Sequence, residues 1–236
     1  MSLSATKVVV LAGGKGTRFR PFSFVIPKPL MPIGQDPILL QLINRFKKSD
    51  IKSFLISTGY QAELVQAYFG DGSRFGVSIK YFHEDKPLGT AGPLSMMKEE
   101  FSDDEYLFLI NGDIYTELNF EEMSKFATKN DYDVVVGYVE KTEKSSFGVL
   151  DITDHKINKI IEKPENTFRI SAGIYCIKGK AIKHIPHDFF TMPDLINHYL
   201  ERGEKVGAFQ IKNFWIGIEN VENLEEALKR IEGPQP

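Results

Sequence analysis

Two hydrophobic periodicities alternate along the first half of the chain. Lys7 to Ala12 reads KVVVLA, a continuous β-branched run typical of a strand buried on both faces. After Pro37, apolar residues recur at 38, 39, 42, 43 and 46, the spacing of one helix face. The same alternation continues with strands at 53–57, 77–82 and 106–110 and helices at 62–69 and 91–101. Strands that alternate with helices in this way predict right-handed βαβ units and a mainly parallel sheet.

The second half of the chain has a less regular pattern. We expect helices and strands, several of the strands hairpin-like, in this order: helix 121–129, strands 133–139, 148–152, 157–161 and 170–177, helix 193–202, strand 206–211 and helix 221–231. No internal repeat or linker-like change of composition interrupts the chain. The simplest prediction is one α/β domain over residues 1–236, with an inserted antiparallel subregion and no further C-terminal domain such as a β-helix.

Composition and charge exclude several classes of protein. The formal net charge of −3 argues against a nucleic-acid-binding surface. No apolar run approaches the roughly 20 residues that span a bilayer, and the run from Val8 to Gly13 is too short for a signal-peptide core. The single cysteine, Cys176, cannot form an internal disulfide and lies in an apolar, strand-like stretch. We therefore expect a cytoplasmic protein with a buried, inert thiol and with neither nucleic acid nor membrane as partner.

A glycine-rich turn directly follows the first strand. Glycines at 13, 14 and 16 let the backbone approach a ligand closely and turn its N–H groups toward an anion. The turn is not a Walker loop, because Lys15 is in the wrong register. Nor is it a dinucleotide fingerprint, because Phe19 stands where a third glycine is required.

Two cations accompany this turn. Arg18 lies inside it, and Lys28 follows between Pro27 and Pro29, whose fixed φ angles predict a defined, extended backbone around the lysine. A lysine held in this way is suited to binding a phosphate. A flexible loop with solvated charges is the alternative that the residues alone leave open.

Five segments together resemble the sugar-1-phosphate nucleotidyltransferases, also called NDP-sugar pyrophosphorylases. The glycine turn has the form G-G-x-G-T-R-x-x-P and is followed by P-K-P. The other segments are EDKPLGTAGPL at 84–94, LINGD at 109–113, EKP at 162–164 and SAGIY at 171–175. The wording PLGTAGPL is nearest to the mannose-1-phosphate guanylyltransferase branch. The resemblance implies the nucleotide-diphospho-sugar transferase fold: a Rossmann-like, mainly parallel sheet with helices on both faces and a small antiparallel sugar-binding subregion.

The resemblance also implies a reaction. A nucleotidyl group would pass from a nucleoside triphosphate, GTP in the nearest branch, to a sugar 1-phosphate, and pyrophosphate would leave. No general base is needed, because a phosphate monoester with a second pKa of about 6 is already largely ionised at neutral pH. The implied catalytic residues are Arg18 on the β,γ-phosphates, Lys28 on the α-phosphate, Asp113 as a ligand of Mg²⁺ and Lys163 on the sugar phosphate.

The remaining site residues are also implied by the resemblance. The nucleotide-binding set comprises Leu11, Ala12, Gly13, Gly14, Gly16, Thr17, Pro87, Gly89, Thr90 and Gly112. The sugar-phosphate-binding set comprises Glu162, Lys163, Ala172 and Gly173.

Three of these residues also allow a plainer interpretation. Asp113 ends an apolar strand, and the carboxyl edge of a parallel sheet is where α/β folds bind ligands, but a turn aspartate would look the same. Thr90 could simply cap a helix. Without the resemblance, Glu162 would be read as half of a surface charge pair with Lys163.

The resemblance fails mainly in one late segment, with a smaller departure at Ser171, where asparagine is common before Ala-Gly. Family members usually carry a second metal-binding aspartate in a Trp-x-Asp-x-Gly segment, whereas this chain has Gly217 at the aspartate position and Glu219 at the glycine position. A glycine cannot ligate a metal through a side chain. Glu219 lies two residues on, and on a strand it would face the same way as residue 217, so it is a candidate substitute.

Three hypotheses follow from this departure. The chain is an active enzyme that uses Asp113, a slow or regulatory homologue that binds a nucleotide-sugar without turnover, or an unrelated nucleotide-binding α/β module. Retention of Arg18, Lys28, Asp113 and Lys163 favours the first. The nucleobase, the sugar and the oligomeric state stay open, with a homodimer as the default among oligomers.

Overall fold

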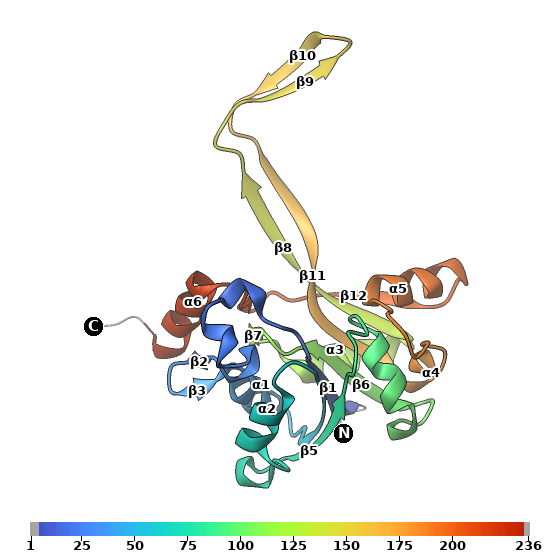
Figure 1. Cartoon of the computed structure of the whole chain (residues 1–236). Coiled ribbons are helices and arrows are strands. Elements are labelled where there is room, and N and C mark those ends of the chain that lie inside the picture. The colour runs from blue at the N-terminus through green and yellow to red at the C-terminus, as the bar shows by residue number, and fades with distance from the viewer. Residues whose placement is uncertain (1–4, 234–236) are drawn as a thin grey trace.

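The computed structural model describes residues 5–233, and its centre is a seven-stranded sheet (Figure 1). Neighbouring strands in this sheet run in the order β12-β8-β11-β6-β1-β4-β5. Their bounds are β1 (Ala5–Ala12), β4 (Ser53–Thr58), β5 (Ser78–His83), β6 (Tyr106–Asn111), β8 (Val134–Lys144), β11 (Glu165–Lys178) and β12 (Val206–Gln210). The pairs β1·β4, β1·β6, β4·β5 and β12·β8 are parallel, and only β11 runs antiparallel to its neighbours. The prediction of a mainly parallel sheet is confirmed.

Helices cover both faces of the sheet. Alternate residues of the central strands point to opposite faces, so each strand contributes side chains to the apolar cluster on either side. Val8 and Val10 of β1 lie in one apolar cluster, and Val9 lies in the other. The first cluster also contains buried residues of α1 (Ile38–Lys47), α2 (Ala62–Phe69) and α3 (Phe120–Asn130). The second contains residues of η5 (Gly92–Glu100), α4 (Gly179–Ile182) and α5 (Met192–Glu201). The β1 strand is therefore buried on both faces, as its continuous apolar sequence predicts.

A third apolar cluster joins distant segments beside the sheet. It contains Ala227 of α6 (Val221–Glu232), Ile216 of β13 (Trp215–Gly217) and Tyr115 of β7 (Ile114–Thr116). Short elements complete this region and the remaining loops: β2 (Pro32–Ile33), β3 (Asp36–Pro37), η1 (Thr17–Phe19), η2 (Phe22–Phe24), η3 (Lys28–Leu30) and η4 (Ser73–Phe75). The cluster packs α6 next to the strands that follow Asp113.

The predicted helix at 91–101 is instead a 3₁₀ helix, η5. Its start is fixed from outside, because the backbone N–H groups of Ala91 and Gly92 both donate to the carbonyl oxygen of Phe190 at 2.9 Å. None of the helices in the described part of the chain is long and apolar enough to cross a membrane. Cys176 of β11 is fully buried, and burial raises the pKa of its thiol, in agreement with the expected inert cysteine.

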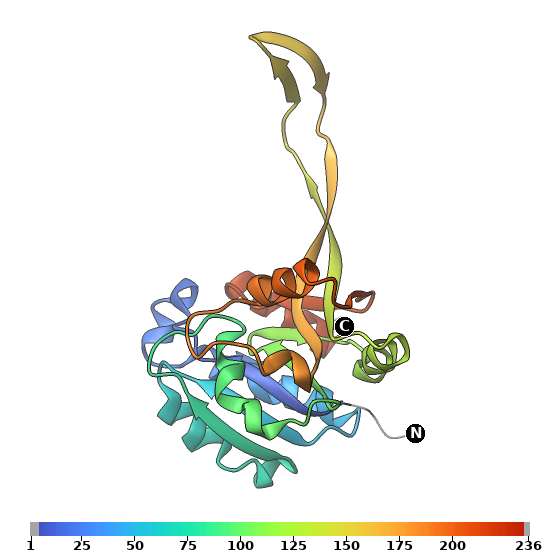
Figure 2. The ribbon, with the colours of Figure 1, turned by 90° about the vertical axis from the view of Figure 1, so that its right-hand side faces the viewer.

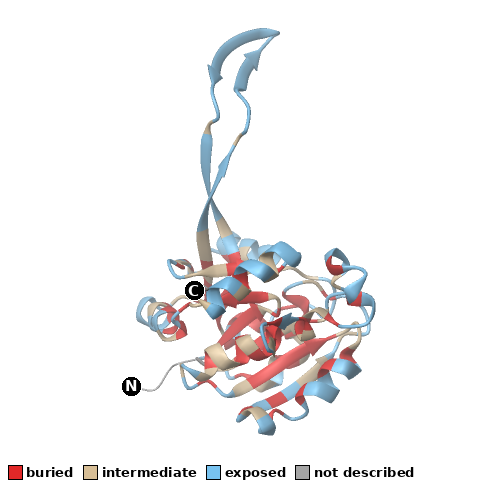
Figure 3. Ribbon diagram, turned by 90° about the vertical axis from the view of Figure 1, so that its left-hand side faces the viewer, coloured by how far each residue is buried: buried red, intermediate tan, exposed pale blue. Residues whose placement is uncertain are grey.

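Strands β8 and β11 extend well beyond the sheet as a two-stranded ribbon, followed at its end by the hairpin β9 (Val149–Thr153) and β10 (Lys156–Ile161). We call residues 140–169 the arm. Figures 1 and 2 show in two perpendicular views that the arm stands clear of the body, and Figure 3 shows that almost all of it is exposed. The predicted antiparallel subregion thus exists, but it projects away from the body.

Candidate active site

A cavity of about 850 Å³ opens at the carboxyl ends of β1 and β6. Its size is within the usual range of ligand sites, roughly 300–1,000 Å³. Three of the four predicted catalytic residues line it, namely Arg18, Lys28 and Asp113. The complete predicted nucleotide-binding set lines it as well: Leu11, Ala12, Gly13, Gly14, Gly16, Thr17, Pro87, Gly89, Thr90 and Gly112. The glycine turn and the segments 84–94 and 109–113 therefore converge on one place in the fold.

The glycine turn forms the wall of the cavity beyond β1. Gly16 has φ +59°, a left-handed conformation that favours glycine, and it begins the η1 turn that carries Arg18. A Cβ atom on Gly13 would lie 2.7 Å from Glu84 Oε1, so a side chain there would push against the carboxylate. Gly14 is exposed and has no neighbour within 4 Å of a Cβ position, which leaves its backbone open to a ligand.

Lys28 and Asp113 form an ion pair inside the cavity, with Lys28 Nζ 2.5 Å from Asp113 Oδ2. The lysine side chain is 16% exposed and also lies over the ring of Phe19, at 5.4 Å from its centroid. Our expectation of extended backbone at Lys28 is wrong, because the residue opens the 3₁₀ turn η3. The N–H of Met31 donates to the Lys28 carbonyl at 3.0 Å and closes this turn.

Pro87, Gly89 and Thr90 form another part of the cavity wall, and the segment 87–92 packs against residues 188–192. Gly89 has φ +82°, and a Cβ there would lie only 2.6 Å from the carbonyl oxygen of Phe190. The Thr90 hydroxyl accepts a hydrogen bond from the N–H of Met192 at 2.8 Å, so Thr90 ties this segment to the first residue of α5, and the N-cap of η5 is Ala91 instead. This arrangement also brings Phe189, which no motif pointed to, to the cavity wall.

Other cavity residues were also missed by sequence reasoning. Glu84 lines the cavity, and its carboxylate accepts from the Ser57 hydroxyl at 2.6 Å and from the N–H of Leu88 at 3.0 Å. These bonds fix its position next to Gly13. Glu84 and Asn111 belong to the family-like segments 84–94 and 109–113. Their place at the carboxyl ends of β5 and β6, where parallel sheets bind ligands, is the signal that could have identified them.

The predicted sugar-phosphate residues are divided between two places. Ala172 and Gly173 are buried in β11, and a Cβ on Gly173 would lie 2.5 Å from Asn111 Nδ2, next to the cavity but not in its wall. Glu162 and Lys163 are exposed on the arm. The strand from Glu165 to Ser171 has six residue steps of about 3.3 Å, so the arm carries both residues roughly 20 Å from the sheet.

The segment with the missing aspartate runs beside Asp113. Ile218 donates its N–H to the Asp113 carbonyl at 2.8 Å, and Gly217 pairs with Ile114 in the β13·β7 ladder. Strand β13 ends at Gly217, so the two-residue alternation of a strand does not apply to Glu219. Glu219 instead accepts a hydrogen bond from Arg18 Nη1 at 2.6 Å. Among residues 5–233, no group of three acidic, histidine or cysteine side chains is placed to hold a metal.

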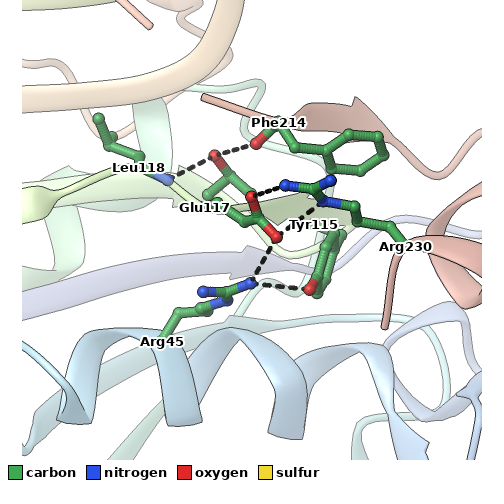
Figure 4. Close-up of polar contacts among 7 residues, drawn as sticks. Arg45, Tyr115, Glu117, Leu118, Phe214 and Arg230 are labelled. Carbon is green, nitrogen blue, oxygen red and sulfur yellow. Dashed lines mark hydrogen bonds and ion pairs between the residues drawn. The ribbon is translucent and has the colours of Figure 1, made fainter. Parts of the chain in front are cut away.

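A charge network fixes the chain directly after Asp113 (Figure 4). Glu117 accepts two hydrogen bonds from Arg230 of α6, at 2.9 and 2.6 Å, and a third from Arg45 of α1 at 3.4 Å. Arg45 also donates to the Tyr115 hydroxyl at 2.8 Å. The hydrogen bond from Arg230, with the nearby guanidinium charges, holds the pKa of Glu117 below its usual value. The network thus ties β7 to two helices.

The family of the chain is decided by its match, over residues 7–233, to the family model described as nucleotidyl transferase. The chain belongs to the nucleotidyl transferase family. A mannose-1-phosphate guanylyltransferase catalytic subunit beta from Danio rerio is 29% identical over 218 residues, which are 90% of this chain and 61% of the relative. A mannose-1-phosphate guanylyltransferase from Mycobacterium tuberculosis is 32% identical over 189 residues, 79% of this chain and 52% of the relative. The chain therefore spans only about half to three fifths of these curated relatives.

A solved structure shows the same fold over nearly the whole chain. HddC from Yersinia pseudotuberculosis, in a complex with GMP-PN, superposes with a TM-score of 0.75 at 28% sequence identity. The superposition covers 96% of this chain and 99% of that chain. Family membership and the predicted fold class are therefore both confirmed.

Proposed function

We propose that this chain transfers a nucleotidyl group from a nucleoside triphosphate to a sugar 1-phosphate and releases pyrophosphate. One observation carries the proposal: a single cavity brings the glycine turn together with Arg18, Lys28 and Asp113. Transfer between two polyanions requires fixed positive charge and backbone N–H groups around the phosphates, which this cavity supplies. The names of the relatives support the same reaction.

The residues divide the work along the triphosphate. The N–H groups of the turn from Gly14 to Thr17, with Arg18, would hold the β,γ-phosphates that leave as pyrophosphate. Lys28 would neutralise the α-phosphate oxygens, and its position is already fixed by Asp113 and Phe19. An oxygen of the sugar phosphate then attacks the α-phosphorus in line, and the bond to the β-phosphate oxygen breaks. Lys163 is the cation proposed to orient the sugar phosphate.

Asp113 is the residue proposed to hold Mg²⁺. Mg²⁺ is commonly bound by one or two carboxylates together with substrate phosphates and water, so a single carboxylate at the cavity wall fits this ion. The ion would supply positive charge to the phosphate oxygens. Glu219, which pairs with Arg18 in the free chain, lies on the segment hydrogen-bonded to Asp113 and is the candidate second carboxylate.

GTP is the proposed nucleotide. The guanylyltransferase names of the relatives and the GMP-PN complex of HddC support guanine. Mannose 1-phosphate is the first sugar to test, followed by heptose, glucosamine and glucose 1-phosphates. The comparisons give no support to a regulatory homologue without turnover, because these relatives are named as transferases.

Pyrophosphate release tests the proposal. The purified chain is incubated with Mg²⁺ and each common nucleoside triphosphate, crossed with a panel of sugar 1-phosphates. We expect release that needs both substrates and is fastest with GTP, and a loss of about 100-fold or more in Asp113→Ala. Leu200→Ala on the outer surface of α5 is the matched control and keeps full activity, since its side chain is 56% exposed. If no combination of nucleoside triphosphate and sugar 1-phosphate releases pyrophosphate, the proposal is refuted.

A further inference from the structure

The tip of the arm presents an apolar face to solvent. The β9·β10 ladder pairs Leu150 with Ile160 and Ile152 with Ile157, which places the four side chains on one side of the hairpin. Their exposed fractions run from 44% to 63%. The last pair of the same ladder, Val149 with Ile161, is exposed as well, and so are Phe147 and Phe168 elsewhere on the arm. So many large apolar side chains on one projection indicate a surface that is covered in the working protein.

A two-stranded hairpin with one bare apolar face also lacks the packing that stabilises a sheet. An isolated hairpin is marginally stable in water, and a hydrophobic face normally needs a third strand, a helix or another surface against it. None of the body elements packs on the tip within the described residues, as Figures 1 and 3 show. The hairpin therefore requires a cover that its own body does not provide in this arrangement.

Charge identifies the kind of cover. The arm carries six basic and six acidic residues, so its formal charge is zero: Lys141, Lys144, Lys156, Lys159, Lys163 and Arg169 against Glu140, Glu143, Asp151, Asp154, Glu162 and Glu165. A neutral arm has no excess of positive charge to attract a polyanion such as a nucleic acid. Its complement is an apolar surface.

The body has exposed apolar side chains on two segments that contribute residues to its own cavity. Phe22, Phe24 and Val25 are 59%, 57% and 73% exposed on the segment that links Arg18 to Lys28. Phe189, 63% exposed, lines the cavity itself. A hairpin laid across the mouth of this cavity would cover both apolar groups. It would also bring Lys163, two residues beyond Ile161, next to the phosphate-binding residues.

The arm cannot reach its own cavity without breaking a regular ladder. Residues 165–171 of β11 pair one for one with residues 144–138 of β8, without interruption. This ladder leads away from the body, and ion pairs such as Lys144 with Glu165 and Arg169 with Glu140 lie across it. A second copy of the chain can accept the arm in the conformation that it already has.

We propose that two copies of this chain exchange arms, so that the tip of each arm covers the cavity mouth of the other copy and delivers Glu162 and Lys163 to it. The exchange is reciprocal, as a two-fold dimer requires. The role of Lys163 on the sugar phosphate rests on the proposed function, whereas the exchange itself rests on the arm. Each active site would then combine Arg18, Lys28 and Asp113 of one copy with Lys163 of the other.

The mass in solution is the first test, because it needs no activity. Light scattering after size-exclusion chromatography should give twice the chain mass of 26.8 kDa at micromolar concentration. Ile157→Lys should reduce the mass to that of one chain without lowering the melting temperature of the body, since Ile157 is 63% exposed. The control, Leu200→Lys, places the same charge on an exposed apolar position of α5 and should leave the dimer intact. A monomeric wild-type chain, or a dimer that survives Ile157→Lys, would overturn the exchange.

Complementation is the second test. Asp113→Ala and Lys163→Ala chains are co-expressed with different tags, and the mixed dimer is purified on both tags. With exchanged arms, one of its two sites has an intact Asp113 and receives an intact Lys163, so the mixed dimer should have about half of the wild-type activity. If each arm serves its own body, both sites lack one residue and the mixed dimer stays as inactive as either parent. That result, or full activity in Lys163→Ala alone, would overturn the proposal.

The two proposals fail in different ways. A wild-type dimer that releases no pyrophosphate with any substrate pair, but becomes monomeric with Ile157→Lys, would sink the proposed function and keep the arm exchange. A monomeric chain that releases pyrophosphate normally would refute the arm exchange and keep the proposed function.

Discussion

Gly89→Ala tests how the structure builds the wall of the cavity at 87–92. Two separate costs apply to an alanine at this position. With φ +82°, the backbone conformation costs an L residue about 1–2 kcal/mol. The new Cβ would also lie 2.6 Å from the Phe190 carbonyl oxygen, whereas carbon and oxygen normally approach to about 3.3 Å. The carbonyl must therefore move by roughly 0.7 Å.

The displaced carbonyl is the acceptor for two backbone hydrogen bonds. The N–H groups of Ala91 and Gly92 both donate to it at 2.9 Å. A shift of about 0.7 Å lengthens them toward about 3.6 Å, beyond the range of a normal bond, at a net cost of about 0.5–1.5 kcal/mol each. With the backbone strain, the free energy of unfolding should fall by about 2–5 kcal/mol, and the melting temperature by roughly 2–4 °C per kcal/mol.

Gly203→Ala is the matched control, because Gly203 has φ +69° but no atom within 4 Å of a Cβ position. It should lose only the strain of about 1–2 kcal/mol. Thermal unfolding followed by circular dichroism measures both variants. Because Phe189 and the 87–90 segment line the cavity, Gly89→Ala should also raise the KM for the nucleotide by about tenfold or more, and Gly203→Ala should not. If Gly89→Ala proves no less stable than Gly203→Ala, the contact with Phe190 does not constrain the wall.

Three further predictions follow from the site and its support. Gly217→Asp should fold normally, because the nearest atoms to a Cβ there are ring carbons of Trp215 at 3.9 and 4.0 Å. The added carboxylate should lower the Mg²⁺ concentration needed for half-maximal pyrophosphate release, and an unchanged Mg²⁺ dependence would contradict this. Glu117→Gln should cost about 1 kcal/mol of unfolding free energy at pH 7, since it weakens a charge-assisted bond with the half-exposed Arg230. The folded-state pKa of Glu117 is lowered, so this stability is present above its unfolded pKa and is lost as the pH falls through the folded value. The difference between wild type and variant should therefore shrink as the pH falls below about 4.3, the usual pKa of a glutamate, and a constant difference in urea titrations would refute the assignment. Cys176 should react with a thiol reagent only at the rate of unfolding, and rapid labelling of the native chain would contradict its burial.

Local patterns predicted the elements of the body well. The helix predicted at 62–69 has the same bounds in the structure, and the strand at 7–12 lies within β1. Both depend on apolar periodicity over a few residues, which the sheet and its two clusters satisfy directly. The cavity was predictable for a related reason: the glycine turn and Asp113 each follow directly on a strand, and the carboxyl ends of these two neighbouring parallel strands lie at the same edge of the sheet.

Pairings between distant segments could not be predicted in this way. Strand β13 pairs Trp215 with Thr116, almost a hundred residues earlier, and each strand has only three residues. Such short runs carry no periodicity of their own. The full length of β8 and β11 was missed for a different reason: beyond Val139 and before Ile170 their residues are mostly polar, and the ribbon is held by backbone bonds and cross-strand ion pairs.

The position of Lys163 shows why a motif identifies a residue more readily than it locates it. The EKP segment is visible in the sequence, but the path of the β8·β11 ribbon decides which cavity the lysine can enter. The apolar residues of the tip indicate only that something covers them. If the apolar tip covers a cavity mouth of this fold, that mouth has the same sequence in the same chain and in a second copy. No sequence pattern therefore distinguishes contact within one chain from contact between two copies. The uninterrupted ladder from Glu165 to Ser171 does distinguish them, because bending it back would break paired backbone groups, whereas exchange between two copies leaves every pair intact.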